Sequence, residues 1–302
     1  MHDTLMPARA LAAVSVGGLL LSGCASSLTP AADGAAGLRD RVPPAVRKAG
    51  VLRIGSYLNY PPVDFRGSDG APAGLDPDLA NAVGKLLGLK IEFVDLPFEK
   101  LIPAVQAHEI DIAMSAVIDT VPRQSGIDDN GRQANPGVDF IDYFITSSSL
   151  LVKAGNPAGV TTLDSLCGHA VAVQTGTVQA EIATRQVGAC SRSGQKLDVH
   201  LLGTDRQALD EVAHGSAVAD LNDYPVAQYN TSAEQGGGFQ LTGGSLQSSP
   251  YAITLNKQDT ELRTALAKAV DQLIRNGEYD KILDKWGLRT GAVSSAVVNG
   301  GR

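Results

Sequence analysis

The chain of 302 residues lacks an excess of basic charge and any regular spacing of histidine or cysteine. Its 25 Lys and Arg are outnumbered by 32 Asp and Glu, which gives a net charge of -7. Nucleic-acid binding needs a concentrated basic face, so a nucleic-acid partner is not expected. The five histidines are scattered and never spaced as metal ligands. We therefore expect no metal site and no cofactor.

Hydrophobic runs are also scarce, and the only apolar stretch near the amino terminus is short. Residues 10–21 follow Arg9 and precede Ser22, Gly23 and Cys24. A basic start and a short apolar run closed by small residues are typical of a secretion signal. A cysteine directly after Ser-Gly is the residue that lipoprotein maturation acylates. We expect residues 1–24 to be a lipoprotein signal peptide with Cys24 lipidated, although a plain secretory peptide with a chance cysteine is an alternative.

Only two cysteines remain if Cys24 carries lipid. Cys167 and Cys190 then form an even pair in an oxidising compartment outside the cytoplasm. This count predicts a disulfide between them, with two buried free thiols as the alternative. A lipid on Cys24 would tie the protein to the cell membrane, because a diacylglyceryl group supplies the two chains that stable anchoring needs.

Strand and helix patterns alternate in two separate runs. The first run begins with an apolar strand at residues 51–56 and continues to a buried strand at 110–114, and the second covers residues 170–221. A further strand at 251–255 precedes a long amphipathic helix at 259–276. The β-α-β order predicts an α/β protein with two lobes, two connecting segments and a central ligand cleft.

The composition also predicts the limits of each part. Residues 25–49 are rich in Ala, Gly, Ser and Pro, which is typical of a flexible linker. The polar segment 124–137 lacks the ligand spacing of a calcium loop and is expected to be solvent-exposed. We expect residues 50–147 plus 250–288 in lobe 1, residues 148–249 in lobe 2, and a disordered tail at 289–302.

Several short motifs resemble the polar amino-acid-binding proteins of ABC importers, solute-binding family 3. The resemblance covers about residues 50–288, and its pieces occur in the family's order and spacing. They include Tyr60-Pro61-Pro62, Gly74-Leu75-Asp76-Pro77-Asp78-Leu79, Val173-Gln174-Thr175-Gly176-Thr177 and Lys285-Trp286-Gly287. The resemblance implies the periplasmic-binding-protein type II fold, in which two lobes close on a ligand.

Two charged residues match the family positions that hold an amino acid. Arg123 matches the arginine that grips the ligand carboxylate, and Asp223 matches the acid of the other lobe that takes the ammonium group. A buried cleft must neutralise both charges of a zwitterion or lose several kcal/mol to desolvation. Only a guanidinium offers two parallel donors to a carboxylate, so lysine should replace Arg123 poorly.

The remaining predicted ligand-binding residues also come from the resemblance. Tyr60 and Phe98 match the aromatic walls around the ligand side chain, with core packing as the alternative for each. The helix that opens after Gly176 places its first amides towards an anion. By family position, the groups that face the carboxylate or lie nearby are Thr177, the amides of Val178 and Ala116, Ser115 and Gln179.

Three departures from the family pattern concern the ligand. Tyr57 stands where members that bind basic ligands use an aspartate, and Ile118 replaces a hydroxyl residue that accepts from the ammonium group. Val178 likewise replaces a common threonine. These changes make the predicted pocket less polar, so we expect a neutral or mildly apolar amino acid, or a related small zwitterion, rather than lysine or arginine.

The resemblance implies a monomeric receptor that delivers its ligand to the membrane permease of an ABC importer. Two other functions share this fold. An enzyme similar to the cyclohexadienyl or arogenate dehydratases needs a catalytic acid or base, and beyond Asp223 no second one is apparent. The ligand-binding domain of a membrane sensor needs a transmembrane helix after Trp286, and no such apolar run follows.

Overall fold

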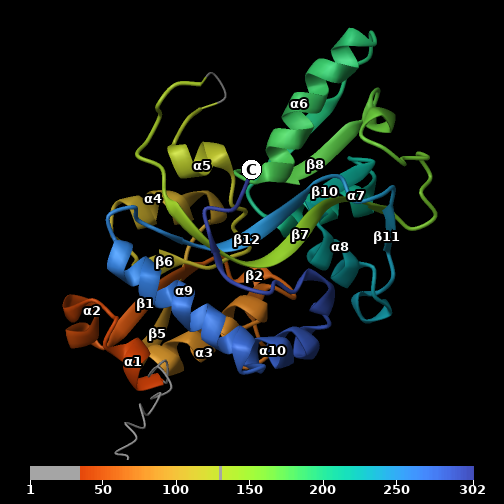
Figure 1. The fold of residues 1–302 in the computed structure, drawn as a ribbon. Coiled ribbons are helices and arrows are strands. Elements are labelled where there is room, and N and C mark those ends of the chain that lie inside the picture. The colour runs from red at the N-terminus through yellow and green to blue at the C-terminus, as the bar shows by residue number, and fades with distance from the viewer. Residues whose placement is uncertain (1–34, 129–130) are drawn as a thin grey trace, which may run out of the picture. The chain divides into compact units, whose positions relative to one another are not determined.

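A long mixed β-sheet forms the centre of the described chain (Figure 1). This computed structural model describes residues 35–128 and 131–302, so the predicted signal peptide, Cys24 and residues 25–34 lie outside the described residues. The strand order is β5-β1-β6-β12-β7-β10-β8-β9. The strands span β1 Val51–Ser56, β5 Lys90–Asp95, β6 Ile112–Ala113, β7 Asp139–Lys153, β8 Ala170–Gln174, β9 Asp198–Leu202, β10 Ala219–Asp223 and β12 Ser248–Leu255.

The sheet has two parallel groups that β7 and β12 join. Strand β1 pairs in parallel with β5 and β6, whereas β8 pairs in parallel with β9 and β10. Strand β7 pairs with β12 up to Ser147 and with β10 from Ser148 onward. The last part of β7 also pairs with β11 (Phe239–Thr242). The predicted α/β class with two strand-helix runs is therefore confirmed. The described residues belong to one compact unit.

Helices cover the first strand group. They are α3 (Leu75–Leu87), α4 (Leu101–Gln106), α9 (Thr260–Arg275) and α10 (Glu278–Trp286), of which α3, α9 and α10 pack against one another. Helix α3 buries Leu79, Val83 and Leu87 on one face, and it ends at Gly88, whose φ of 69° gives the left-handed conformation that helix ends favour. A small sheet of β2 (Asn59–Tyr60), β3 (Asp64–Arg66) and β4 (Pro72–Ala73) precedes α3.

The second strand group is covered by α6 (Val178–Arg192), α7 (Asp205–His214) and α8 (Tyr224–Asn230). Helix α7 begins at Asp205 because Thr204 and Gln207 form a reciprocal capping box. In the part of the chain that the structure describes, no helix is both long and apolar enough to cross a bilayer. That same part contains no group of three or more His, Cys, Asp or Glu placed to hold a metal ion.

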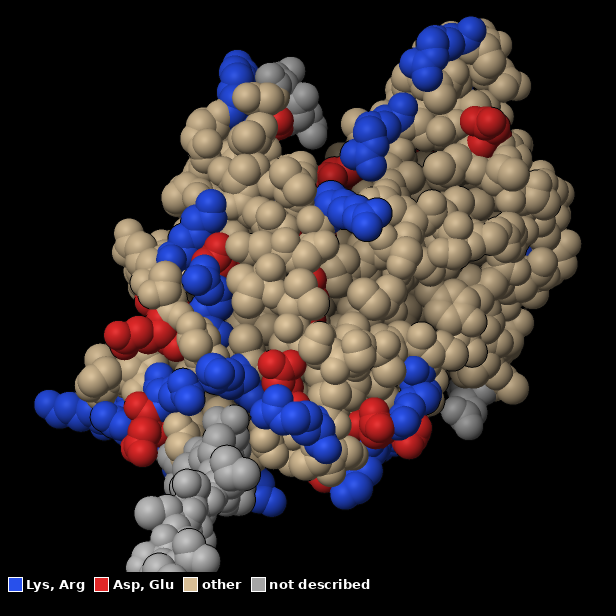
Figure 2. All heavy atoms as spheres, viewed as in Figure 1, with Lys and Arg blue, Asp and Glu red and all other residues tan. Residues whose placement is uncertain are grey.

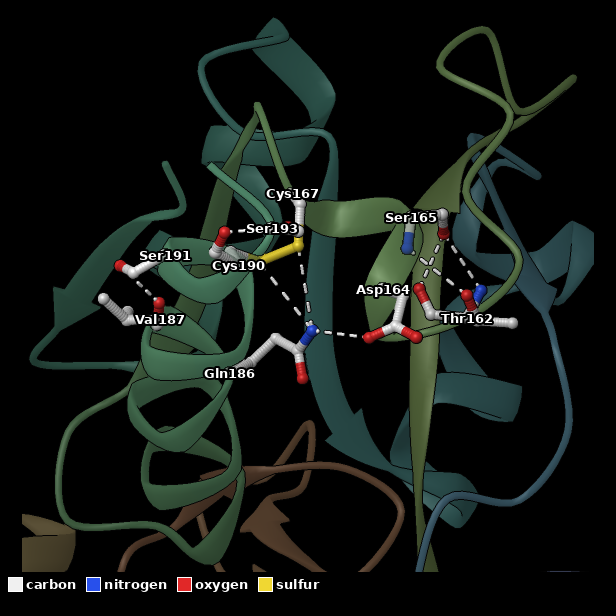
Figure 3. Close-up of a disulfide and its surroundings, with 9 residues drawn as sticks. All are labelled: Thr162, Asp164, Ser165, Cys167, Gln186, Val187, Cys190, Ser191 and Ser193. Atoms are coloured by element: carbon white, nitrogen blue, oxygen red, sulfur yellow. Dashed lines mark hydrogen bonds between the residues drawn. A yellow bond between two sulfur atoms is a disulfide. The ribbon is translucent and has the colours of Figure 1, made fainter. Parts of the chain in front are cut away.

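The predicted disulfide between Cys167 and Cys190 is present (Figure 3). Cys190 lies in α6, and Cys167 follows a short turn at Asp164–Leu166. The Gln186 amide lies beside both sulfur atoms and donates to Asp164 Oδ1 at 3.0 Å. The bridge closes a loop with a separation of 23 residues and so fastens α6 to the chain before β8.

The prediction of a flexible linker is wrong for residues 35–49. These residues form α1 (Ala35–Arg39) and α2 (Pro44–Ala49), and α1 packs against α3 and α9. Leu38 and Val42 are 2% and 1% exposed. Pro44 is compatible with a helix because it occupies the first turn of α2. Because small residues dominate the composition of this segment, the sequence did not indicate that two of its apolar side chains are buried in the core.

The prediction of a disordered tail at 289–302 is also wrong. A short turn at Arg289–Gly291 leads to β13 (Val297–Val298), which pairs antiparallel with β7 at Asp142 and Ile141. The tail is ordered because β7 offers backbone groups that a further strand can satisfy. In the predicted exposed segment 124–137, residues 131–136 are exposed, and residues 129–130 lie outside the described part.

Candidate functional site

A small cavity lies between the two strand groups, where the space-filling view shows the surface hollowed between the α5 and α6 sides (Figure 2). Its volume of about 10 Å³ has room for about one water. Every residue predicted to bind the ligand lines it, and Gln174 is added. The lining residues are Tyr57, Tyr60, Phe98, Ser115, Ala116, Ile118, Arg123, Gln174, Thr177, Val178, Gln179 and Asp223.

The cavity lies at the carboxyl ends of parallel strands, which is where ligands bind in open α/β sheets. Tyr57 directly follows β1, Gln174 ends β8 and Asp223 ends β10. Val178 and Gln179 are the first two residues of α6, and Thr177 precedes them as the helix cap. The sheet therefore brings together side chains from both strand groups.

Arg123 connects the two sides of the cavity. It lies on the short helix α5 (Val121–Ser125), which Thr120 caps. One terminal nitrogen of its guanidinium donates to the carbonyl oxygen of Ile118 at 2.8 Å, and the other donates to that of Gly176 at 2.9 Å. Burial lowers the pKa of Arg123, and the carboxylate of Glu181 acts in the opposite direction. A guanidinium has five N–H donors, so donors remain for a further acceptor.

Asp223 presents a carboxyl group to the same cavity and is 4% exposed. The side-chain amide of Gln179 donates to its Oδ1 at 2.8 Å, and the hydroxyl of Tyr60 lies 3.1 Å from its Oδ2. Burial raises the pKa of Asp223 to about 7, although the nearby hydroxyl of Tyr60 and the hydrogen bond from Gln179 act against that rise. A cationic group that entered the cavity would favour the ionised carboxylate.

Further contacts cross between the two sides. The Tyr60 hydroxyl donates to Asn222 Oδ1 at 2.5 Å. The side-chain amide of Asn222 is itself held within the second strand group, where it donates to the buried carboxyls of Asp205 at 2.6 Å and Asp220 at 2.8 Å. Gly176, with φ of 80°, approaches so closely that an added Cβ would lie 3.1 Å from the Cβ of Glu99. The cavity is therefore in a closed state.

Buried acids form hydrogen bonds with Ser115 and Ala116, which line the cavity on the side of the first strand group. Asp64 Oδ2 accepts from Ser115 Oγ at 2.5 Å, and Asp76 Oδ2 accepts from the amide of Ala116 at 2.9 Å. Burial raises the pKa of Asp76 to about 7, against the hydrogen bonds from Tyr143 and Ala116. The Ala116 amide, which the resemblance assigns to the ligand carboxylate, already has an acceptor in Asp76 in this closed state.

The Thr177 hydroxyl is also occupied. It donates to the carbonyl of Gln174 at 2.7 Å and accepts from the amide of Ala180 at 3.1 Å, so it caps α6 rather than facing a carboxylate. Within the described residues, no acceptor pairs with the amides of Val178 and Gln179. Those two amides point from the helix amino terminus and remain able to bind an anion.

Gln174 is the lining residue that the sequence prediction missed. Its side chain is 6% exposed, and its amide nitrogen has no hydrogen-bond partner in the described chain. A buried donor without a partner costs about 1–3 kcal/mol, so such a group calls for a ligand or a water. The position at the end of a strand, two residues before Gly176, was the signal that could have found it.

Comparisons with known proteins agree on one family. Residues 52–289 match the bacterial extracellular solute-binding proteins, family 3. The chain is 27% identical to the arginine-binding protein ArgT of Corynebacterium glutamicum over 260 residues, covering 85% of this chain and 81% of that protein. The structure of an ancestral arginine-binding protein bound to arginine has a TM-score of 0.70 and 29% identity, covering 78% of this chain and 98% of the other.

A further solved structure bears on the enzyme alternative. The ancestral amino acid-binding protein AncCDT-1, a precursor of cyclohexadienyl dehydratase, has a TM-score of 0.69 and 30% identity. The match covers 80% of this chain and 97% of that protein. That protein is itself described as a binding protein. The two-lobed type II fold predicted from the motifs is confirmed by these structural neighbours.

Proposed function

Because the chain belongs to the bacterial extracellular solute-binding proteins, family 3, we propose that it captures an amino acid or a related small zwitterion. In this function it receives the ligand outside the cytoplasm and delivers it to the membrane permease of an ABC importer. The observation that carries the proposal is that Arg123 and Asp223 line one cavity from opposite sides of the cleft. Their charges complement the carboxylate and the ammonium of a zwitterion.

The proposal gives each group a role. The free donors of Arg123 and the amides of Val178 and Gln179 receive the ligand carboxylate, and Asp223 receives the ammonium. Tyr60 and Phe98 flank the ligand side chain. Since the two charges of one ligand are held from different sides, binding favours the closed state over the open one.

Ligand entry requires the cleft to open, because the closed cavity has room for about one water. We infer lobes of residues 50–147 plus 250–288 and residues 148–249, with the hinge where β7 changes partners between Ser147 and Ser148. Opening breaks the bonds from Arg123 to Gly176 and from Tyr60 to Asn222. When the lobes close again, these bonds reform, and a bound zwitterion adds its own contacts with the cavity.

The charge of the cavity supports a ligand with a neutral side chain. Among the lining residues that the structure describes, Arg123 is the only cation and Asp223 the only acid. A zwitterion with a neutral side chain balances both, whereas a basic side chain would leave a buried charge without a partner. Tyr57 adds a phenol whose pKa burial raises to about 12, so it stays neutral. Gln174 offers an amide donor for one polar group of the ligand side chain.

We favour a binding protein over an enzyme. Catalysis needs a positioned acid or base with a second group to complete the reaction. Asp223 is accounted for by the ammonium of the ligand, and no other acid lines the described cavity. The relatives named above are binding proteins, which points in the same direction.

The proposal also includes attachment to the membrane. A lipid on Cys24, next to a secretion signal at residues 1–24, would keep a monomeric receptor near its permease. Mass spectrometry of the protein extracted from bacterial membranes tests whether Cys24 is acylated. Replacement of Cys24 by serine should release the protein into the soluble fraction.

The direct test is a thermal-shift panel of the twenty amino acids, betaines and opines. The protein should begin at residue 25, because a form that begins after residue 38 would lose the buried Leu38. A ligand at 100 times its Kd adds about 2.7 kcal/mol of stability by mass action. We expect one or a few neutral amino acids to raise the Tm. A panel without any shift, or the conversion of prephenate or arogenate detected by mass spectrometry, would reject the proposed function.

A further inference from the structure

The segment Val297 to Gly301, which we call the strap, lies outside the family match that ends at residue 289. Figure 1 marks the carboxyl end of the chain beside α5. Val297 and Val298 pair with β7, the strand that joins the two strand groups. Asn299 continues the pairing, because its amide donates to the Phe140 carbonyl at 3.1 Å and its side chain accepts from the Phe140 amide at 2.8 Å.

The end of the strap contacts the loop before α5. The amide of Gly301 donates to Asp119 Oδ2 at 2.8 Å, and Asp119 is 1% exposed. The side chain of Gln124 donates to Asp119 Oδ1 at 2.7 Å and to the Gly301 carbonyl at 3.4 Å. Asp119 and Gln124 thus join the strap to the chain on both sides of Arg123.

Only glycine fits at the point of contact. A Cβ on Gly301 would overlap the backbone carbonyl of Asp119, and one on Gly300 would lie 2.6 Å from Asp142 Oδ2. Neither glycine has a positive φ, so the requirement is for close approach rather than for an unusual backbone. The backbone of the strap therefore lies directly against the loop.

The same loop supplies the contacts of the pocket arginine. Asp119 follows Ile118, whose carbonyl accepts from the Arg123 guanidinium at 2.8 Å. The amide of Asp119 also donates to the carbonyl of Pro250 in β12 at 3.0 Å. Helix α5 is five residues long, and none of its residues is completely buried. So short a helix gains little stability by itself, and external contacts must hold it.

We propose that the strap is a positioning element for Arg123, which fixes residues 118–126 in the geometry that receives the ligand carboxylate. This inference rests on the proposed function for the role of Arg123, but the effect on the loop does not. Loss of the strap frees the loop on the Gly301 side, so the guanidinium samples more orientations and binding costs more conformational entropy.

The test compares three variants of the chain from residue 25 onward with the unaltered protein. Gly301→Ala introduces the overlap with Asp119, and a deletion of residues 297–302 removes the strap. Gly238→Ala is the matched control, because a Cβ there meets no atom within 4 Å and its φ is not positive. Hydrogen exchange is measured without any ligand at the amides of Gln124, Gly126 and Val138, which all donate to carbonyl oxygens of the segment 118–126.

We expect these amides to exchange at least about tenfold faster in the Gly301→Ala and deletion variants, since local opening sets their protection. The amides of α6 and the Gly238→Ala protein should not change. Unchanged protection of the loop in Gly301→Ala would overturn the proposal. If the deletion unfolds the whole protein, the Gly301→Ala result alone decides whether the strap holds the loop. Faster exchange throughout the molecule in Gly301→Ala would also overturn it, because the strap would then support the fold and not the loop.

Affinity is measured with the panel amino acid that raises the wild-type Tm most. We expect Kd to increase about tenfold in both strap variants, in line with the loss of one well-oriented charged contact. Faster loop exchange with an unchanged Kd would overturn the positioning role. If no amino acid binds the wild type, the proposed function fails, whereas the exchange result still decides whether the strap holds the loop.

Discussion

The Tyr60 hydroxyl donates to Asn222 Oδ1 at 2.5 Å, and this bond joins residues that are 162 positions apart in the sequence. It forms only when the two sides of the cleft are together. Tyr60→Phe should therefore favour the open state and weaken ligand binding about 2- to 10-fold, since a hydrogen bond contributes about 0.5–1.5 kcal/mol. Calorimetry and the radius of gyration from small-angle scattering measure both effects. Tyr224→Phe is the control, because Tyr224 is 39% exposed.

Replacement of Arg123 by lysine tests the carboxylate contact. A point charge cannot reproduce a fork of two donors, so affinity should fall more than about tenfold, which corresponds to about 1.4 kcal/mol or more. The exposed Arg185 on α6 provides the control substitution Arg185→Lys. A calorimetric Kd that stays the same in Arg123→Lys would refute the assigned role.

Asp223 should make the affinity depend on pH. Its pKa of about 7 means that the carboxyl is mostly protonated at pH 5, and an ammonium group needs the ionised form. The affinity for a zwitterion should therefore increase up to about tenfold per pH unit from pH 5 towards 7 and level off above. Asp223→Asn should abolish that slope and weaken zwitterions while sparing ligands that carry only a carboxylate. Equal losses for both ligand types would contradict the assignment.

Stability should follow pH in the opposite direction. Burial raises the pKa of Asp205 to about 6, of Asp76 to about 7 and of Asp142 to about 8, from an ordinary 3.8. Between about pH 4 and 8 the folded state thus holds more protons than the unfolded state, so the free energy of unfolding falls as pH rises. Urea unfolding at pH 5 and 8.5 measures the fall. Asp142→Asn should reduce it, whereas Asp40→Asn, at a side chain 84% exposed, should leave it as it is.

The disulfide gives a prediction for stability alone. A bridge with a separation of 23 residues should stabilise the fold by about 3 kcal/mol in the chain-entropy treatment. The double substitution of Cys167 and Cys190 by serine should lower the free energy of unfolding by about that amount. Dithiothreitol should have the same effect on the wild type and none on the double variant. If the reductant destabilises both proteins equally, the bridge is not the cause.

The sequence predicted those elements whose patterns are local. Strand β1 spans the predicted residues 51–56, because its apolar pattern lies within one short stretch. Helix α1 and strand β13 were missed, since each depends on contacts with distant residues. Leu38 is buried against helices that come much later in the chain, and Val297 pairs with Asp142.

For the site too, the local motifs were predictable and the contacts between distant residues were not. The motifs placed all of the predicted ligand-binding residues around one cavity, although their binding roles stay a prediction. The partners of individual atoms could not be predicted. Asp76 takes the amide of Ala116 from 40 positions away, and the Thr177 hydroxyl caps its own helix. Such contacts depend on the packed structure and not on periodicity or spacing.

The docking of α1 onto α3 and α9 would also set how far the folded protein lies from a lipid on Cys24. Helix α1 starts at Ala35, so a lipid on Cys24 would leave ten residues, 25–34, between the anchor and the folded protein. Ten residues extend at most about 36 Å, which is comparable with the width of the protein itself. If Cys24 carries a lipid, this span would keep the folded protein close to the bilayer and would give it a local concentration of roughly millimolar near a neighbouring transporter.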